Sequence, residues 1–150
     1  MNETNLHKLP AAGLVKRLLA GLYDWLLVIA LMMVVSVPAV VLLDDAISPG
    51  NAAYRSAMVT VALVFFVYFW INGGQTLGMR AWRLRLFSGD GEPVTLSQAL
   101  RRFAAAWVSA LPAGLGFWWA LFDAEGRTWH DRWSATRIVQ LPPRKTAGGN

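Results

Sequence analysis

Two charged residues at the start of a long apolar stretch could carry chemistry inside a membrane. The 26 residues from Leu18 to Leu43 contain one charged group, the carboxylate of Asp24, and Arg17 directly precedes them. A spacing of seven residues is about two helical turns, so Arg17 and Asp24 project from nearly the same helix face. A charge at the bilayer centre costs at least ~3 kcal/mol, and membrane carboxylates therefore often bind a cation or relay a proton.

The position of Asp24 allows two interpretations. If the hydrocarbon begins at Trp25, Asp24 lies at the interface beside Tyr23, and Arg17 and Asp24 only anchor the helix and neutralise each other. The 19 uncharged residues from Trp25 to Leu43 are enough to cross a core of ~30 Å, which favours this anchor. In the other interpretation, Asp24 is a buried functional carboxylate. The sequence leaves both interpretations open.

Other catalytic or ligating patterns are missing from the sequence. The chain has no cysteine and only two histidines, so a thiol nucleophile, a disulfide framework and a zinc site are not expected. His130 and Asp131 are adjacent, and on a helix their side chains point about 100° apart. The segment Gly74–Gly78 lacks the spacing and the Lys-Ser/Thr ending of a phosphate-binding loop. We therefore expect no enzyme activity, metal or cofactor. The net charge of +5 comes from Lys and Arg side chains, which we expect to contact anionic lipid headgroups rather than nucleic acid.

Three apolar segments define the fold class. Segments 18–43 and 56–72 are long enough to cross a bilayer as helices. The third segment, 103–122, is interrupted at Leu111–Gly116 by one proline and two glycines, so each half reaches about halfway through the core. It either re-enters and returns or crosses as a kinked helix. The sequence thus predicts an all-α membrane protein with two full transmembrane helices, a third broken segment and a small cytoplasmic β-hairpin.

The loop after the second segment carries turn and strand signals. Asn72-Gly73-Gly74 suits a helix C-cap, and Trp82–Phe87 alternates apolar and basic residues as a strand does. Ser88–Gly91 predicts a turn, and Pro93–Leu96 a short returning strand. Thr136–Leu141 also alternates and is a second possible partner for the strand at Trp82–Phe87.

A helix with basic residues is expected to follow this loop. Thr95 and Gln98 fit a capping box at its start. Five arginines in and after the loop are interpreted as a solvated surface that faces lipid headgroups. They are Arg80, Arg83, Arg85, Arg101 and Arg102.

The C-terminal part of the chain predicts an interfacial helix followed by a tail. In Gly126–Trp133 an arginine precedes Asp131 by four residues, and two tryptophans are also four apart. This spacing suits a short helix with its tryptophans toward lipid and its charges toward water. Residues 1–9 are expected to be an N-terminal tail and residues 142–150 a disordered tail, on either side of a membrane domain of residues 10–141.

Several short motifs follow one another along the chain from about Pro10 to Leu141. They are Arg17-Leu18-Leu19-Ala20 with Asp24, Gly74-Gln75-Thr76-Leu77-Gly78-Met79-Arg80, Gly89-Asp90-Gly91, Arg101, and Thr128-Trp129-His130-Asp131 with Thr136. In order and spacing they resemble the RDD family of bacterial membrane proteins. That family is named for one arginine and two aspartates, matched here by Arg17, Asp24 and Asp131. The resemblance implies a multi-pass protein of the bacterial inner membrane.

Two functions are compatible with these residues. In the first, the protein is an oligomeric transporter or ion/proton exchanger in which Asp24 and Asp131 bind a cation or proton, and Arg17 tunes their pKa values. In the second, it is a non-transporting accessory or scaffold subunit that uses Arg17 and Asp24 as an assembly pair. Two full spans cannot enclose a pathway alone, so we expect a homo-oligomer or a partner membrane protein. The loop residues expected to support the site are Gly74, Thr76, Gly78 and Arg80.

The distribution of basic residues predicts the topology. If segment 103–122 re-enters, thirteen of the fourteen Lys and Arg lie on one side with both termini, and only Arg55 lies opposite; a full crossing gives eight against six. Cytoplasmic loops carry the excess of Lys and Arg, so we expect both termini and the 73–102 loop in the cytoplasm. Reporter fusions after Asn150 and within Ser48–Asn51 test this arrangement. A periplasmic signal from the C-terminal fusion contradicts re-entry.

Overall fold

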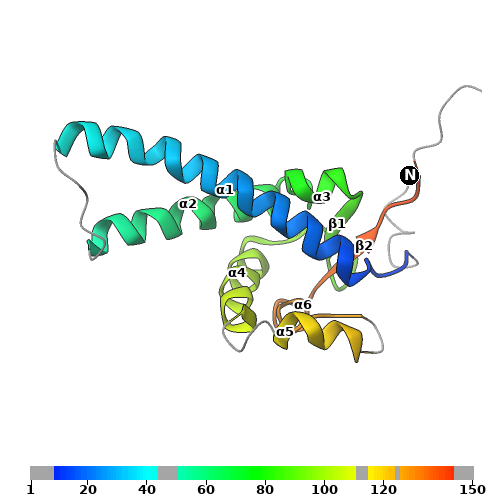
Figure 1. Ribbon diagram of the computed structural model, residues 1–150. Helices are drawn as coiled ribbons and strands as arrows, with labels where there is room; N and C mark the ends of the chain where they lie inside the picture. Colours follow the sequence, from blue (N-terminus) through cyan, green and yellow to red (C-terminus); the bar gives the residue numbers. More distant parts are fainter. Residues whose placement is uncertain (1–8, 44–50, 111–114, 124–125, 144–150) are drawn as a thin grey trace, which may run out of the picture.

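The structure is a computed structural model that describes residues 9–43, 51–110, 115–123 and 126–143 (Figure 1). Most of the described regular structure is helical. Its elements are α1 (Leu14–Leu43), α2 (Ala52–Ile71), α3 (Leu77–Ala81), β1 (Leu84–Ser88), α4 (Leu96–Ala110), α5 (Leu115–Trp118), η2 (Trp119–Leu121), α6 (Trp129–Trp133) and β2 (Thr136–Gln140). The predictions for most of both tails and for the centre of the third apolar segment lie outside the described residues.

Two helices are long and apolar enough to cross a membrane. They are Leu14–Pro38 within α1 and the whole of α2. Only 17% and 6% of their most apolar stretches are buried inside the protein, which is unlike the core helix of a soluble fold. The helices run side by side in Figure 1, and the Ser36 and Tyr54 hydroxyl oxygens share a hydrogen bond of 2.7 Å between them. They correspond to the two predicted full spans.

A small antiparallel sheet joins three distant parts of the chain. β1 pairs with β2 along its full length, from Leu84 to Ser88. The segment before α1 extends this pairing, because the Ala12 amide donates to the Ile138 carbonyl oxygen at 3.0 Å. The second predicted partner of the β1 strand is therefore the correct one. The segment before α1, the loop after α2 and the C-terminal segment therefore meet in one sheet.

The prediction of a returning strand at Pro93–Leu96 is wrong. Proline has no amide hydrogen to donate to a sheet. The next residues begin α4 instead: the Thr95 amide donates to Gln98 Oε1 at 3.0 Å, and the Gln98 amide donates to Thr95 Oγ1 at 3.3 Å. This is the predicted capping box, and it uses the backbone groups that a strand would have needed.

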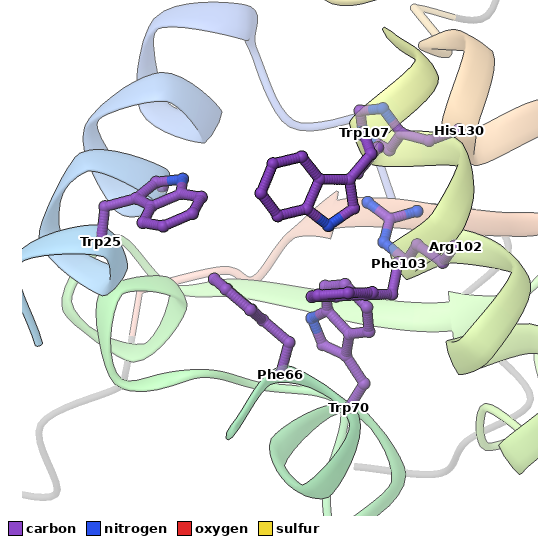
Figure 2. Close-up of a pocket in the computed structure, with 9 residues that line it drawn as sticks. Trp25, Phe66, Trp70, Arg102, Phe103, Trp107 and His130 are labelled. Carbon is purple, nitrogen blue, oxygen red and sulfur yellow. The ribbon is translucent and has the colours of Figure 1, made fainter. Parts of the chain in front are cut away.

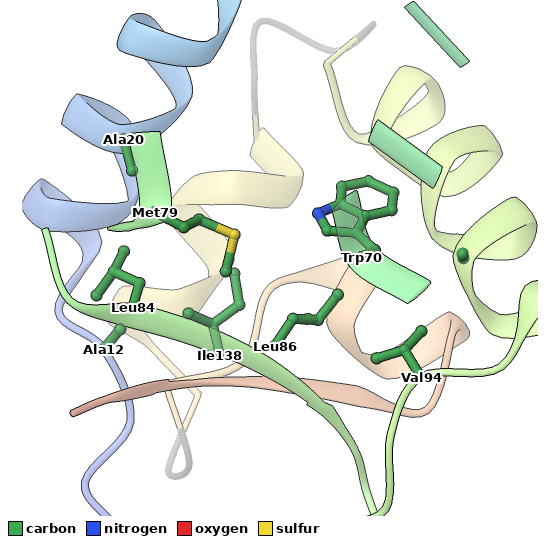
Figure 3. Close-up of a cluster of buried hydrophobic side chains, with 9 residues drawn as sticks. Ala12, Ala20, Trp70, Met79, Leu84, Leu86, Val94 and Ile138 are labelled. Carbon is green, nitrogen blue, oxygen red and sulfur yellow. The ribbon is translucent and has the colours of Figure 1, made fainter. Parts of the chain in front are cut away.

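The hydrophobic core lies among the sheet, the start of α1, the end of α2 and the start of α4 (Figure 3). Leu84 and Leu86 alternate along β1 so that both face this core, as expected for a strand with one covered face. The buried core residues are Ala12, Ala20, Trp70, Met79, Leu84, Leu86, Val94, Ala99 and Ile138. The core therefore fixes the first turns of α1 against the loop after α2, which is where the polar sites lie.

The described part of the third apolar segment consists of the end of α4, then α5 and η2, and α5 packs against α4. α4 runs without interruption from the arginine-bearing region into this segment. The predicted basic helix and the first half of segment 103–122 are therefore one helix. α5 contacts α4 closely: a Cβ atom added to Gly116 would lie 2.6 Å from the Ser109 Cβ. Residues 111–114, between the two helices, lie outside the described residues.

Arg83 offers a test of the backbone that leads into β1. It has a left-handed conformation, with φ at 55°, and its side chain is exposed. This conformation costs a non-glycine residue about 1 kcal/mol, so Arg83→Gly should raise the free energy of unfolding by a similar amount. Thermal unfolding in detergent measures this change. The control is Arg85→Gly within β1, which should lower stability; a melting temperature of Arg83→Gly at or below that of wild type contradicts the expectation.

Candidate functional site

The first buried polar site surrounds Asp24, which is only 2% exposed. The Thr76 hydroxyl donates to Asp24 Oδ2 at 2.5 Å, and the Gly78 amide donates to Oδ1 at 2.8 Å. The Thr76 oxygen also accepts a hydrogen bond from the Met79 amide at 3.2 Å, which caps α3. We call Asp24, Thr76 and Gly78 the Asp24 site. It fastens the start of α3 to α1.

Gly78 allows α3 to approach α1 this closely. A Cβ atom at this position would lie 2.2 Å from the Ala20 carbonyl oxygen and 2.9 Å from Asp24 Cγ. Both distances are far below van der Waals contact, so any side chain would push the two helices apart. The glycine is therefore a requirement for the hydrogen bond between its amide and Asp24.

The other predicted loop residues have different positions. Gly74 has φ of 70°, and a Cβ atom there would lie 2.3 Å from the Leu86 carbonyl oxygen. Its own carbonyl oxygen accepts a hydrogen bond from the Leu86 amide at 2.7 Å, so it ties the loop to β1. Arg80 is exposed in the last turn of α3 and takes no part in the Asp24 site.

The expected pairing of Arg17 with Asp24 is wrong. Arg17 Nη1 donates to Asp131 Oδ2 at 2.7 Å, and Nη2 donates to the Ile138 carbonyl oxygen at 3.3 Å. Two helical turns separate Arg17 and Asp24 by about 10 Å along the axis. Helical side chains also lean toward the N-terminus, so Arg17 leans away from Asp24. The two residues therefore belong to different sites.

The second buried polar site surrounds Asp131, whose exposure is 0%. Its Oδ1 accepts from Arg102 Nη1 at 2.6 Å, while Oδ2 accepts from Arg17 and from the Thr128 amide at 3.1 Å. Asp131 and Thr128 form the capping box of α6. We call Asp131, Arg17, Arg102 and Thr128 the Asp131 cluster. The expectation that the acid of this helix faces water is wrong, because capping turns its carboxylate back toward the helix start and the two arginines.

The prediction that Arg102 lies on a solvated surface is also wrong. Its exposure is 3%, its Nη1 also donates to Thr136 Oγ1 at 2.7 Å, and its Cζ lies 5.4 Å from the centre of the Trp70 ring. A sequence pattern could have indicated this burial. Small residues recur at helical spacing on both sides of Arg102, as they do on a helix face that packs against protein. The buried residues along α4 are Ala99, Arg102, Ala105 and Ser109.

Charge in the Asp131 cluster does not balance. Arg17 and Arg102 face one carboxylate through ion pairs of 2.7 and 2.6 Å, so the three groups together carry one positive charge. Burial by itself would raise the pKa of Asp131, but the positive charges of Arg102 and Arg17 and the hydrogen bond from Arg102 outweigh it. They hold the pKa of Asp131 well below its usual range, so the acid stays ionised.

His130 is buried beside this cluster and is neutral at pH 7. Its Nε2 and the Thr128 hydroxyl oxygen are 2.9 Å apart and share a hydrogen bond. Burial, followed by the charges of Arg102 and Arg17, lowers the pKa of His130 from its ordinary 6.5 to about 3, and the charge of Asp131 opposes the change. His130 therefore adds no positive charge near neutral pH.

The hydrogen bonds of both sites join separate elements of this chain. Among the described residues, no three His, Cys, Asp or Glu side chains lie close enough to hold a metal. The partners of Asp24 and Asp131 are hydroxyl, amide and guanidinium donors. A hard cation is bound by several oxygen ligands instead.

The sequence is similar to a known protein family. The model described as the RDD family matches residues 11–135. This range includes the arginine and both aspartates, and it covers most of the chain. The comparisons with curated proteins and with solved structures found no match.

Arg101 and Arg102 form a matched pair for testing the Asp131 cluster. Arg102→Ala removes the hydrogen bonds to Asp131 and Thr136 but leaves the Arg17–Asp131 pair, and we expect it to cost about 2–4 kcal/mol. Arg101 is exposed on the same helix, so Arg101→Ala should cost well under ~1 kcal/mol. Thermal unfolding of both variants in detergent compares them. Equal and small losses would mean that Asp131 is hydrated rather than buried.

The neutral His130 makes stability depend on pH. Below pH 6.5 the unfolded chain binds a proton that the folded chain does not bind until about pH 3, so stability is complete above pH 6.5 and falls as the pH drops. Lowering the pH from 7 to 5 should remove about 2 kcal/mol of stability through this group. His130→Gln cannot titrate and should reduce the slope of melting temperature against pH. Equal slopes in the two proteins would contradict this assignment.

Proposed function

The chain belongs to the RDD family, and on that basis we propose that it is an accessory subunit of a membrane protein complex rather than an ion or proton exchanger. Family membership and the two apolar helices indicate a membrane protein. The proposal depends mainly on one observation: both aspartates of the family pattern are held by donors of their own chain. Asp24 accepts from Thr76 and Gly78, and Asp131 is held by two arginines.

An exchanger needs a carboxylate that can change partners during each cycle. Release of Asp131 would leave two buried guanidinium groups without a counter-charge, which is costly. Release of Asp24 would detach the start of α3 from α1. Structural attachment explains these contacts more simply than ion binding does.

The contacts between α1 and α2 also favour a role without ion passage. Apart from the Ser36–Tyr54 hydrogen bond, the helices form an open groove lined by Leu31, Val35, Thr60, Val61, Val64, Phe65, Tyr68 and Phe69. Its threonine donates to the Ser56 carbonyl oxygen in its own helix at 2.8 Å. Ion routes through membranes are lined by polar or charged groups. The apolar outer faces of both helices suit contact with lipid or with another membrane protein.

We infer further that the third apolar segment enters and leaves the membrane on one side. The inference is supported by the sheet, because Ala12, β1 and β2 are hydrogen bonded to one another. These pieces precede the first span, follow the second and follow the third segment. Hydrogen-bonded strands must share one side of the bilayer, and the packing of α5 against α4 is consistent with a segment that turns back.

Transport through Asp24 is the second candidate function. It is favoured by the burial of this acid within a candidate span, at 2% exposure. Ionisable residues in such positions commonly serve in ion or proton relays. This function requires the carboxylate to exchange its bonds with Thr76 and Gly78 for a cation or a proton.

Flux measurements in reconstituted vesicles separate the two functions. We expect vesicles with wild-type protein to hold a pH or sodium gradient as well as protein-free vesicles do, and Asp24→Asn to behave identically. Asparagine keeps the shape of the side chain but carries no charge. Asp90→Asn, at an exposed acid in the turn after β1, is the matched control. Dissipation by wild type that is lost in Asp24→Asn and kept in Asp90→Asn establishes transport instead.

The accessory role also predicts a stable assembly. Native mass measurement after extraction from the membrane in mild detergent should find the chain in a complex of fixed stoichiometry, with itself or with another membrane protein. The apolar faces of α1 and α2 would supply the contacts. A chain that is monomeric under every gentle extraction condition contradicts the proposal.

A further inference from the structure

An aromatic pocket lies beside the Asp131 cluster and takes no part in the function proposed above. Its volume is about 220 Å³, and it lies between α1, α2, α4 and α6. The lining residues are Gly21, Trp25, Phe66, Trp70, Arg102, Phe103, Ala106, Trp107 and His130. Figure 2 shows the aromatic rings around an open space, with Arg102 and His130 at one side of it. We call this space the aromatic pocket.

The pocket has an apolar rim and a polar floor. Trp25 and Trp107 are 43% and 46% exposed, and their ring centres are 6.4 Å apart in an edge-to-face arrangement. Trp70 and Arg102 are only 8% and 3% exposed, so they form the floor. The two tryptophans are thus in contact at the rim, and a molecule that enters beside them passes along apolar rings before it reaches the guanidinium group.

The Arg102 guanidinium has donors left for a ligand. Its hydrogen bonds within the described residues, to Asp131 and Thr136, both come from Nη1. The edge formed by Nε and Nη2 is thus not used by these partners. Two parallel N–H groups on one edge of an arginine match the two oxygens of a carboxylate or phosphate.

The charge around the pocket selects an anion. Arg17 and Arg102 share one carboxylate, which leaves one positive charge beside the floor. None of the lining residues is acidic. Aromatic rings alone would also suit a quaternary ammonium group, but the guanidinium repels a cation from this site.

The size and surroundings of the pocket suit part of an amphiphile. An apolar cavity of ~150 Å³ holds benzene, so a pocket of about 220 Å³ has room for a small anionic head and the first few carbons of a chain. Tryptophans such as those at the rim are typical of the headgroup depth of a bilayer, where the remainder of a chain could extend into lipid. We propose that the aromatic pocket binds an amphiphile with a carboxylate or phosphate head, which contacts the Nε and Nη2 edge of Arg102.

A series of ligands with the same chain length tests this proposal on the full-length protein in maltoside micelles. The probes are decanoate, decyl phosphate, decanol and decyltrimethylammonium, and native mass spectrometry counts the molecules bound per chain. At least one of the two anions should bind once per chain and at least tenfold more tightly than decanol, with the cation weakest. Preference for decyl phosphate indicates a phospholipid as the natural source, and preference for decanoate indicates a free fatty acid.

Three variants locate the binding site. Arg102→Lys keeps the positive charge beside Asp131 but loses the paired donors, and it should weaken anion binding at least tenfold. Ala106→Phe fills the pocket without changing any member of the Asp131 cluster, and it should weaken binding to a similar extent. Arg101→Lys lies outside the pocket and should bind as wild type does.

Three results overturn the proposal. Equal binding of decanol and both anions would show that the head is not recognised. Tighter binding of decyltrimethylammonium would make the pocket a cation site. Unchanged anion binding in Ala106→Phe would place the ligand elsewhere, and this variant decides the question even if Arg102→Lys does not fold. None of these results depends on whether the vesicles hold a gradient.

Discussion

A carboxylate removed from water needs hydrogen-bond donors and positive charge around it, and Asp131 obtains both from three helices. Arg17 comes from α1, Arg102 from α4, and the Thr128 amide from the start of α6 itself. The positions of these helices are consequently coupled, since moving any one of them would leave a buried charge without its partner. The sheet and the apolar core border this contact, since Thr136, the Ile138 carbonyl oxygen and the Trp70 ring lie against its two arginines.

Asp24 is also a buried carboxylate, but its hydrogen-bond donors are of a different kind. No ion pair holds it within the described residues; instead a hydroxyl and a backbone amide do, and Gly78 lets that amide come close. Asp24 therefore docks a loop on the first span, whereas Asp131 couples helices through charge. The two acids of the family pattern have separate structural roles in this chain.

Local patterns in the sequence were sufficient for α1, α2, α4, α6 and both strands, whereas α3 was not predicted. Apolar length predicted α1 and α2, Thr95 and Gln98 predicted the start of α4, and alternation found both strands. Pairing was harder, because the partner of β1 lies about fifty residues later and a nearer segment also looked suitable. Contacts between distant charges were missed for a related reason. Spacing on one helix brought Arg17 and Asp24 to one face, but it carries no information about Asp131 on another element. Arg102 looked like its exposed neighbour Arg101, and only the small residues along the same stripe distinguish the two.

The ion pair between Arg17 and Asp131 joins residues 114 positions apart, and this separation affects how the protein is made. The ribosome completes the first helix long before it adds the acid that neutralises Arg17. Arg102 is also synthesised before this acid, which follows it by 29 positions. During synthesis both arginines keep their full positive charge, which opposes transfer of the neighbouring segments across the membrane. Insertion of the apolar helices thus comes first, and closure of the polar cluster comes among the last steps, when α6 and β2 become available.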